Sequence, residues 1–193
     1  ALNVAGLGAK VSLVGLVGED KHGEELLRVL AASGIDAEQM CVAPGIATTT
    51  KTRIVTGHQQ VLRVDEDPAD GPLDHELAQR IVAEATRALA ARPHAVILSD
   101  YAKGVLDEHV CSEIIRQASA LEIPVFIDPK GGNYGRYTGA DVITPNLKEL
   151  ELATGVDRRE IDALIDDGEE LVAGLNIGAL VLTRSADGLT LVN

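Results

Sequence analysis

The sequence predicts an α/β protein with a mostly parallel, open sheet and helices on both faces. Apolar runs with strand composition alternate with helical patterns from the start of the chain. The later runs are continuously apolar, as in strands buried on both faces. The order strand, helix, strand, helix requires crossover connections, which are right-handed in nearly all proteins. These observations together favour a doubly wound sheet.

The first β-α unit is expected near the amino end of the chain. An apolar run over 11–17 is followed by a helical pattern that ends at Gly34 and carries Leu26, Leu27 and Leu30 on one face. Later runs with the composition of buried parallel strands cover residues 94–100, 123–128, 140–144 and 179–183.

Helices are expected between these strands. Asp74 and Asp107 each stand where they can cap an amphipathic helix that covers the sheet. A third helix should begin near Asn146 and end at Gly155, and a fourth should cover about 160–174.

Residues 41–66 interrupt the alternation. Two β-rich runs flank a turn at 56–58 with no helix between them, which predicts an inserted β-hairpin. Because ligands of such sheets bind outside the carboxyl ends of the strands, we expect this hairpin to act as a lid, with a hinge at 68–72. The predicted organisation is a first core segment (1–40), the hairpin lid, and a second core segment (67–193).

Composition narrows the classes of partner. The formal net charge of −13 disfavours nonspecific binding to nucleic acid or to an anionic membrane, because both would repel the chain. One Phe, three Tyr and no Trp leave few stacking platforms for single-stranded nucleic acid. An anionic small molecule would need a locally basic site, so the positions of the 17 Lys and Arg residues matter more than their number.

The cysteines and the apolar runs indicate a cytoplasmic location. Cys41 and Cys111 are widely separated, which predicts neither a disulfide framework nor a thiolate metal site. No apolar run approaches the roughly 18 to 20 residues needed to cross a bilayer. The histidines lack metal-ligand spacing, and no G-x-S-x-G nucleophile elbow occurs.

Glycines in the segment 14–36 open the first helix. They either permit a tight turn or lie close to a ligand. Neither the P-loop sequence nor the G-x-G-x-x-G dinucleotide fingerprint is present, so a nucleotide would have to bind in another way.

Two successive strands end in polar residues. Asp100 and Lys103 follow the strand over 94–100, and Lys130 with two glycines follows the next. Ligands are expected at these strand ends, and glycines let a backbone approach a phosphate. The alternative is that Asp100 forms a turn and Lys103 is a solvated charge.

Two further motifs follow the last predicted strands. Asn146 and Glu149 stand three residues apart in TPNLKELE, where they either form a capping box or hold a hydrated Mg²⁺ through oxygen ligands. TRSADG, with Thr183, Arg184 and Gly188, suits a loop that contacts phosphate or ribose, and a plain hairpin turn would have the same composition.

The hairpin carries basic residues on an otherwise acidic chain. Lys51 and Arg53 are two apart on one strand and therefore share a face, and Arg63 lies on the other strand. These residues either clamp a phosphorylated substrate or are solvated strand charges.

The order of these motifs resembles the ribokinase-like (PfkB) carbohydrate kinases. VGLVGEDKHGEELLRVLAASGID resembles the segment after the sugar-binding glycines of that family, and TPNLKELE resembles its N-x-x-E magnesium and phosphate motif. The resemblance covers nearly the whole chain. Within the family, the segments most similar to D-glycero-β-D-manno-heptose 7-phosphate kinases are TTTKTRIV, QQVLRVDEDP, VILSDYAKGVL, IDPKG, TPNLKELE and VLTRSADGLTL.

The resemblance implies transfer of the γ-phosphoryl group of ATP to the anomeric hydroxyl of the heptose 7-phosphate, with Mg²⁺. It also implies a homodimer formed through the hairpin. Asn146 and Glu149 would organise Mg²⁺ and phosphate. The nucleotide would lie near Asn146, Thr183, Arg184 and Gly188, and the phosphosugar near Lys51, Arg53, Arg63, Asp100, Lys103 and Lys130.

The chain also departs from the family pattern. The G-A-G-D segment, which carries the general-base aspartate, does not occur and is expected downstream of Asn193, while the sugar-binding G-G-x-x-N segment is expected upstream of Ala1. We therefore expect a fragment truncated at both ends. The alternatives are a ribokinase-like kinase for ribose, fructose or a hexose phosphate, and a non-catalytic sugar- or nucleotide-binding module.

Overall fold

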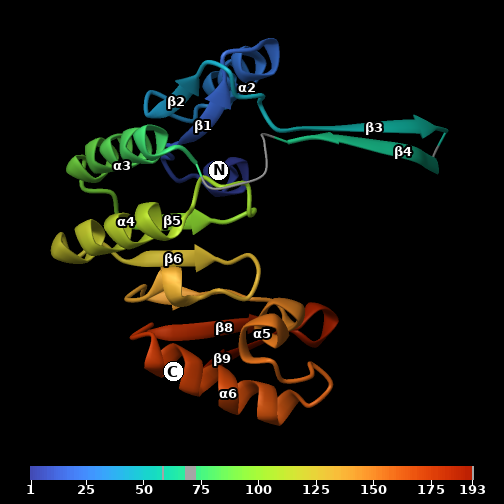
Figure 1. Cartoon of the computed structure of the whole chain (residues 1–193), viewed down its shortest axis with the longest axis vertical. Coiled ribbons are helices and arrows are strands. Elements are labelled where there is room, and N and C mark those ends of the chain that lie inside the picture. Colours follow the sequence, from blue (N-terminus) through green and yellow to red (C-terminus); the bar gives the residue numbers. More distant parts are fainter. Residues whose placement is uncertain (58, 68–72, 193) are drawn as a thin grey trace. The chain divides into compact units, whose positions relative to one another are not determined.

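The computed structural model describes residues 1–57, 59–67 and 73–192. The chain divides into two compact units, Ala1–Ala88 and Leu89–Asn193 (Figure 1). The described elements that begin in the first unit are, in order, α1 (Leu2–Gly6), β1 (Gly15–Gly18), α2 (Lys21–Ala32), β2 (Met40–Ala43), β3 (Thr50–Thr56), β4 (Gln59–Glu66) and α3 (His75–Ala90).

A β-α-β arrangement forms the first unit's small parallel sheet. β1 pairs with β2 in parallel, and Val17 pairs with Val42 in the register. The predicted strand over 11–17 begins later than expected, at Gly15, although Ser12 makes an isolated bridge to Asp36. The predicted helix is confirmed as α2, which Asp20 caps.

The junction between β1 and α2 is tied to the segment that leads into β3. Thr48 donates from its backbone N–H to Asp20 Oδ2 and from its hydroxyl to Asp20 Oδ1, each at 2.8 Å. The Thr48 hydroxyl in turn accepts from the backbone N–H of Gly18 at 2.9 Å. A Cβ at Gly18 would lie 2.1 Å from the carbonyl oxygen of Ile46, so only glycine fits there. Close packing against another segment of the protein therefore accounts for this glycine.

The predicted hairpin is confirmed as the antiparallel pair β3 and β4, with an irregularity between Ile54 and Val55. Its expected start at residue 41 is wrong, because Met40–Ala43 form β2, which pairs with β1, and the hairpin begins at Thr50. It forms one long two-stranded ribbon (Figure 1). Ile54, Leu62 and Val64 are exposed apolar residues on one face of this ribbon. The turn residue His58 and the predicted hinge 68–72 lie outside the described residues.

The second unit contains one sheet in the strand order β5-β6-β7-β8-β9. β5 to β8 run parallel, and β9 pairs antiparallel with β8. Its described elements are β5 (Val96–Ser99), α4 (Glu108–Ala120), β6 (Val125–Asp128), the 3-10 turn η1 (Gly135–Tyr137), β7 (Val142–Ile143), α5 (Leu147–Thr154), α6 (Ile161–Gly174), β8 (Ala179–Thr183), the 3-10 turn η2 (Ser185–Asp187) and β9 (Leu189–Val192). The predicted α/β class with a mostly parallel sheet is confirmed.

One face of this sheet forms the core of the second unit. Leu98, Ile127, Ile143 and Leu180 pair in register across four strands and are almost completely buried. α4 packs against β6, while α5 and α6 pack against β8. Strand order follows chain order here, so right-handed crossovers bring these helices to the same face.

The opposite face corrects one expectation. Ile97 is 56% exposed and its partner Phe126 is 37% exposed, so β5 and β6 are not buried on both faces. Their residues alternate between buried and exposed, although the sequence runs are continuously apolar. A continuously apolar sequence run therefore does not by itself predict that both faces of its strand are buried.

The predicted helices agree well with the structure. α3 begins one residue after Asp74, and Asp107 caps α4 by accepting the Val110 N–H at 2.8 Å. α5 begins after Asn146 and ends before Gly155, as predicted. Both cysteines are buried free thiols whose pKa values are raised chiefly by burial, so neither is a reactive thiolate.

Candidate functional site

The polar residues that follow the strands of the second unit meet at one edge of its sheet. The loop after β5 is joined to the end of β6 by the Asp100 N–H, which donates to the Asp128 carbonyl at 2.9 Å. The loop after β7 is joined in the same way to the end of β8, where Thr183 donates its N–H to the Pro145 carbonyl at 2.8 Å. This edge is where ligands of an open α/β sheet bind.

Asn146 and Glu149 form a complete capping box at the start of α5. Glu149 N–H donates to Asn146 Oδ1 at 3.0 Å, and Asn146 N–H donates to Glu149 Oε2 at 3.1 Å. The capping interpretation is therefore confirmed as geometry. The capping box uses only one oxygen of the Glu149 carboxylate. The other oxygen, Oε1, accepts a hydrogen bond from Lys130 Nζ at 2.9 Å.

The Lys130–Glu149 pair brings together two predicted site residues from different loops. Glu149 is 7% exposed, whereas about half of the Lys130 side chain is exposed. The hydrogen bond to Glu149 is the main cause of the raised pKa of Lys130, which keeps this amine protonated at neutral pH. A fixed cation thus lies beside a buried carboxylate at the strand ends.

Close packing sets the path of the loop that carries Lys130. A Cβ at Gly132 would lie 2.4 Å from the carbonyl oxygen of Leu152, so this glycine is required by contact with α5. Tyr134 is buried, and its hydroxyl has no hydrogen-bond partner among the described residues. Burial, and secondarily the charge of Glu149, raises the pKa of Tyr134. The hydroxyl therefore stays protonated.

Asp100 is held by the protein on several sides. It is 5% exposed and accepts from the Tyr137 hydroxyl at 2.6 Å and from the Ala102 N–H at 2.7 Å. Arg136 Nη1 lies 3.3 Å from the same carboxylate. The bond to Ala102 fits the interpretation of Asp100 as a turn former, and half-buried Lys103 follows on the same loop.

Sequence reasoning did not single out Arg136 and Tyr137. They lie in η1, which connects β6 to β7, and not directly after a strand. The pattern of residues around them contains no motif spacing. Only the tertiary contact with Asp100, 36 residues from Arg136 along the chain, reveals them.

The predicted nucleotide residues form the turn between β8 and β9. Arg184 N–H donates to the Gly188 carbonyl at 2.8 Å, so TRSADG is a hairpin turn, as its alternative interpretation required. Arg184 Nη1 lies 3.4 Å from Thr190 Oγ1, and Arg184 Nε is buried without a hydrogen-bond partner in the described part of the chain. Thr183 makes an isolated bridge to Asn146. These two predicted regions are therefore adjacent.

Lys51 and Arg53 share one face of the hairpin, as predicted, and the register adds Arg63 to the same face. Arg53 is the register partner of Arg63, and Lys51 is the partner of Asp65. Asp65, which no sequence motif marks, lies 3.1 Å from Lys51 Nζ and 2.9 Å from Arg63 Nε. The hydrogen bond from Lys51 is the main cause of the lowered pKa of Asp65. Asp65 is therefore ionised at neutral pH and offsets part of the positive charge of the basic residues.

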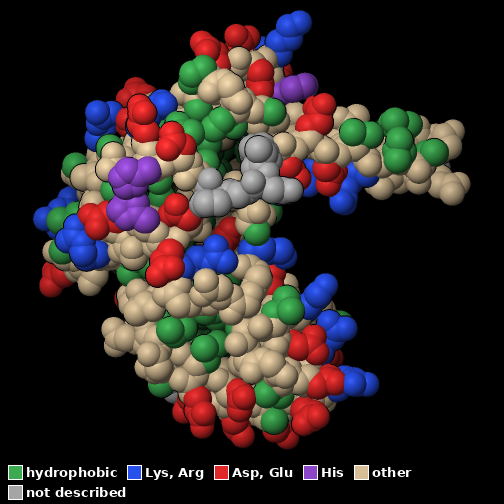
Figure 2. Space-filling view, in the orientation of Figure 1, with side chains coloured by type: hydrophobic (Ala, Val, Ile, Leu, Met, Phe, Trp, Pro, Cys, Tyr) green, Lys and Arg blue, Asp and Glu red, His purple; other side chains and the backbone are tan. Residues whose placement is uncertain are grey.

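Along the hairpin, charged side chains lie nearer its base and apolar side chains lie toward its tip (Figure 2). The exposed ion pairs contribute little to stability, because solvent screens them and both side chains lose entropy. Their basic members therefore remain available to an anionic ligand.

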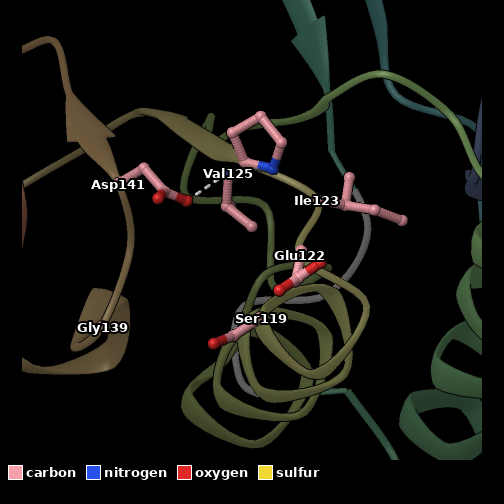
Figure 3. Close-up of a pocket in the computed structure, with 7 residues that line it drawn as sticks. Ser119, Glu122, Ile123, Val125, Gly139 and Asp141 are labelled. Atoms are coloured by element: carbon pink, nitrogen blue, oxygen red, sulfur yellow. Dashed lines mark hydrogen bonds between the residues drawn. The ribbon is translucent and has the colours of Figure 1, made fainter.

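A pocket of about 350 Å³ lies elsewhere in the second unit (Figure 3). It is at the amino ends of β6 and β7, away from the strand ends described above, and Asp141 Oδ2 accepts the Val125 N–H there at 2.7 Å. Its lining residues are Ser119, Glu122, Ile123, Pro124, Val125, Gly139 and Asp141. Two carboxylates and no Lys or Arg make it unsuitable for phosphate.

No dedicated metal cage is present among the described residues, since no group of three or more His, Cys, Asp or Glu side chains could hold an ion. The oxygen atoms of Asn146 and Glu149 still suit Mg²⁺, because this ion is commonly held through one or two carboxylates, waters and substrate phosphates. Among the described helices, none is long and apolar enough to cross a membrane.

Comparisons with known proteins agree with the motifs. The family model described as "pfkB family carbohydrate kinase" matches residues 1–193. The chain is 41% identical over 196 residues to the bifunctional protein HldE of Magnetococcus marinus, covering 100% of the chain and 40% of that relative. It is 42% identical over 194 residues to HldE of Methylobacillus flagellatus, covering 100% and 39%. The chain thus spans about 40% of the length of these curated relatives.

Solved structures show the same fold. The ribokinase of Arabidopsis thaliana, complexed with ribose and ATP, has a TM-score of 0.73 at 16% identity and is covered to 61% by the whole chain. Phosphofructokinase-2 from Escherichia coli, in complex with potassium, has a TM-score of 0.77 at 16% identity and is covered to 62% by the whole chain. The predicted ribokinase-like fold is confirmed, and the chain belongs to the pfkB family of carbohydrate kinases.

Proposed function

We propose that the protein containing this chain is an ATP- and Mg²⁺-dependent kinase that phosphorylates the anomeric hydroxyl of D-glycero-β-D-manno-heptose 7-phosphate. The observation that carries the proposal is the Lys130–Glu149 pair, 2.9 Å apart, on the capping box of Asn146 at the sheet's ligand-binding edge. Family membership supports the sugar kinase class, and the resemblance of the sequence segments to heptose 7-phosphate kinases supports this acceptor.

The chemistry of phosphoryl transfer matches these residues. Catalysis consists mostly of alignment and of neutralising charge on the transferring group. Bound Mg²⁺ would supply part of that positive charge. Asn146 and Glu149 would hold the hydrated ion, and Lys130 would supply a further cation from the protein. The nucleotide would contact the turn that contains Thr183, Arg184 and Gly188.

The acceptor's phosphate requires a second basic region. We assign this role to Lys51, Arg53 and Arg63, which share one face of the hairpin with Asp65 between two of them. Arg side chains bind phosphate oxygens in a bidentate manner, which suits such a clamp. Asp100, Lys103 and Lys130 would line the space between donor and acceptor. We assign no residue of this chain to the general base.

We further propose that the hairpin pairs two copies of the protein. Ile54, Leu62 and Val64 expose a row of apolar side chains on the face opposite the basic residues. Sedimentation of the complete gene product should show a dimer that Leu62→Asp converts to monomer, because a buried carboxylate lacks a partner. A dimer that persists in this variant would contradict the assignment.

The substrate is tested with a coupled ADP-release assay on the complete gene product. D-glycero-β-D-manno-heptose 7-phosphate, ribose and fructose 6-phosphate are supplied separately with MgATP. Turnover confined to the heptose phosphate supports the proposal. Preference for ribose or fructose 6-phosphate would change the acceptor while keeping the kinase class, and binding of ATP without turnover on any sugar would favour a non-catalytic binding module.

A further inference from the structure

Arg136 connects segments that follow two different strands. Its Nη1 lies 3.3 Å from Asp100 Oδ2 and donates to the Leu106 carbonyl at 3.2 Å, both in the loop after β5. Its Nη2 donates to the Lys130 carbonyl at 3.3 Å, and its Nε donates to the Asn133 carbonyl at 3.1 Å, both in the loop after β6. One guanidinium group therefore holds both loops.

Tyr137 completes this arrangement from the adjacent position. Its hydroxyl donates to Asp100 Oδ2 at 2.6 Å, and its ring lies under the Arg136 guanidinium at 5.3 Å. Tyr137 is completely buried and only 19% of the Arg136 side chain is exposed, so water screens these contacts weakly. Loss of either partner would leave the Asp100 carboxylate buried with fewer donors.

Two proposed site residues depend on the segments that Arg136 holds. The main chain of Lys130 accepts directly from Arg136, while its side chain donates to Glu149. Lys103 lies between Asp100 and Leu106, the two contact points of Arg136 on the other loop. The spacing between Lys103 and Lys130 thus depends on Arg136, which lies outside the sequence motifs.

We propose that Arg136 is a positioning residue for phosphoryl transfer, which sets the spacing of Lys103 and Lys130 through the loops after β5 and β6. This inference rests on the proposed kinase function. Arginine suits the role because its planar group presents five donors in a fixed fork, whereas lysine offers three donors from one nitrogen. Lysine at position 136 would keep the positive charge near Asp100 and lose simultaneous contact with both loops.

The test compares Arg136→Lys with Arg116→Lys in the complete gene product. Arg116 is a matched control, because it lies in the same unit and pairs with Glu113 on the surface of α4. kcat and KM are measured per folded molecule, and amide hydrogen exchange is followed over 100–106 and 130–133. For Arg136→Lys we expect kcat to fall about 10- to 100-fold, as for small misplacements of reacting groups.

The KM for ATP should stay within about twofold in Arg136→Lys, since none of the contacts of Arg136 involves the turn after β8. Exchange over both loops should become faster, and Arg116→Lys should match the wild type in every measurement. Tyr137→Phe is a second variant, which keeps the ring under Arg136 and removes one donor to Asp100. It should lower kcat in the same direction by a smaller factor, and it serves if Arg136→Lys does not fold.

The outcomes separate this inference from the proposed function. A lower melting temperature with wild-type kcat per folded molecule would make Arg136 a purely structural residue and overturn the inference. Wild-type exchange over both loops in the variants would overturn it as well. If the wild type phosphorylates no sugar, the proposed function fails, and the inference fails with it as a statement about catalysis.

Discussion

Lys130 Nζ lies 2.9 Å from Glu149 Oε1, while the other oxygen of Glu149 accepts the N–H of Asn146 at 3.1 Å. One carboxylate therefore closes the first turn of α5 and also holds a cation that comes from the loop after β6. The two contacts use different oxygens. A substitution that keeps an acceptor oxygen but removes the charge can separate the role in the helix from the role in catalysis.

Glu149→Gln makes this separation. The amide oxygen can still accept from Asn146, so the helix cap and the melting temperature should change little. Loss of the charge should lower kcat by roughly 10²-fold, within the range seen when one electrostatic contact to a transition state is removed. It should also weaken the dependence of turnover on Mg²⁺ concentration. Steady-state kinetics across a magnesium titration check this, and an unchanged dependence would count against the assigned role of Glu149.

Arg63→Ala tests the basic face of the hairpin. We expect the KM for the phosphosugar to rise about tenfold, the effect of losing one charge-assisted contact, while the KM for ATP changes by less than about twofold. Arg28→Ala is the control, because Arg28 lies in the same unit and pairs with Glu25 on the surface of α2. Equal losses for both substrates would contradict the clamp.

Asp20 predicts a pH effect on stability. Hydrogen bonds from the Thr48 backbone, the Gly23 backbone and the Thr48 hydroxyl lower the pKa of Asp20 from 3.8 to about 2. Because the folded state holds the ionised form, this contribution to stability is present above about pH 4 and is lost as the pH falls toward 2.

Asp20→Asn should therefore have a lower melting temperature than the wild type at pH 6, and the difference should shrink between about pH 4 and 2. Calorimetry across this range checks the prediction. Other carboxylates, such as Glu113 and Asp157, also have lowered pKa values, and they titrate in both proteins. The difference in melting temperature between the wild type and Asp20→Asn therefore reports on Asp20 alone. A difference that is constant with pH would argue against the hydrogen bonds assigned to the ionised Asp20 carboxylate.

Gly132→Ala tests the packing that positions Lys130. The new Cβ would lie 2.4 Å from the Leu152 carbonyl, so the loop must move away from α5. We expect a loss of about 1–3 kcal/mol in the free energy of unfolding, typical of overpacking, together with a lower kcat. Gly174→Ala is the matched control, since its Cβ would meet no atom within 4 Å. Chemical denaturation of both variants decides, and equal stabilities would show that the loop adapts freely.

Local patterns predicted much of the second unit. Asp107 and Asn146 cap helices where the sequence placed their starts, because a capping side chain bonds to backbone groups only three residues away. The apolar runs over 123–128 and 140–144 contain shorter strands than expected, β6 and β7. Strand length depends on the neighbouring strand, which the local sequence does not specify.

Contacts between distant residues were less predictable. Asp65 lies among the basic residues of the hairpin because the register pairs it with Lys51. Tyr137 reaches Asp100 across 37 positions of the chain. Neither contact follows from spacing, since each depends on which strands or loops become neighbours. The exposed positions of Ile97 and Phe126 depend in the same way on where the crossover helices lie.

The sequence by itself determined the α/β class, the hairpin, the helix starts and the motifs of the carbohydrate kinase family, because each is encoded in short segments whose residues interact locally. Only the tertiary structure decided that Lys130 pairs with Glu149 and that Arg136 holds the loops after β5 and β6. The physical reason is that these contacts either join groups 19 or more residues apart or use main-chain carbonyls as acceptors. Every residue has a main-chain carbonyl, so no sequence pattern marks which of them will accept.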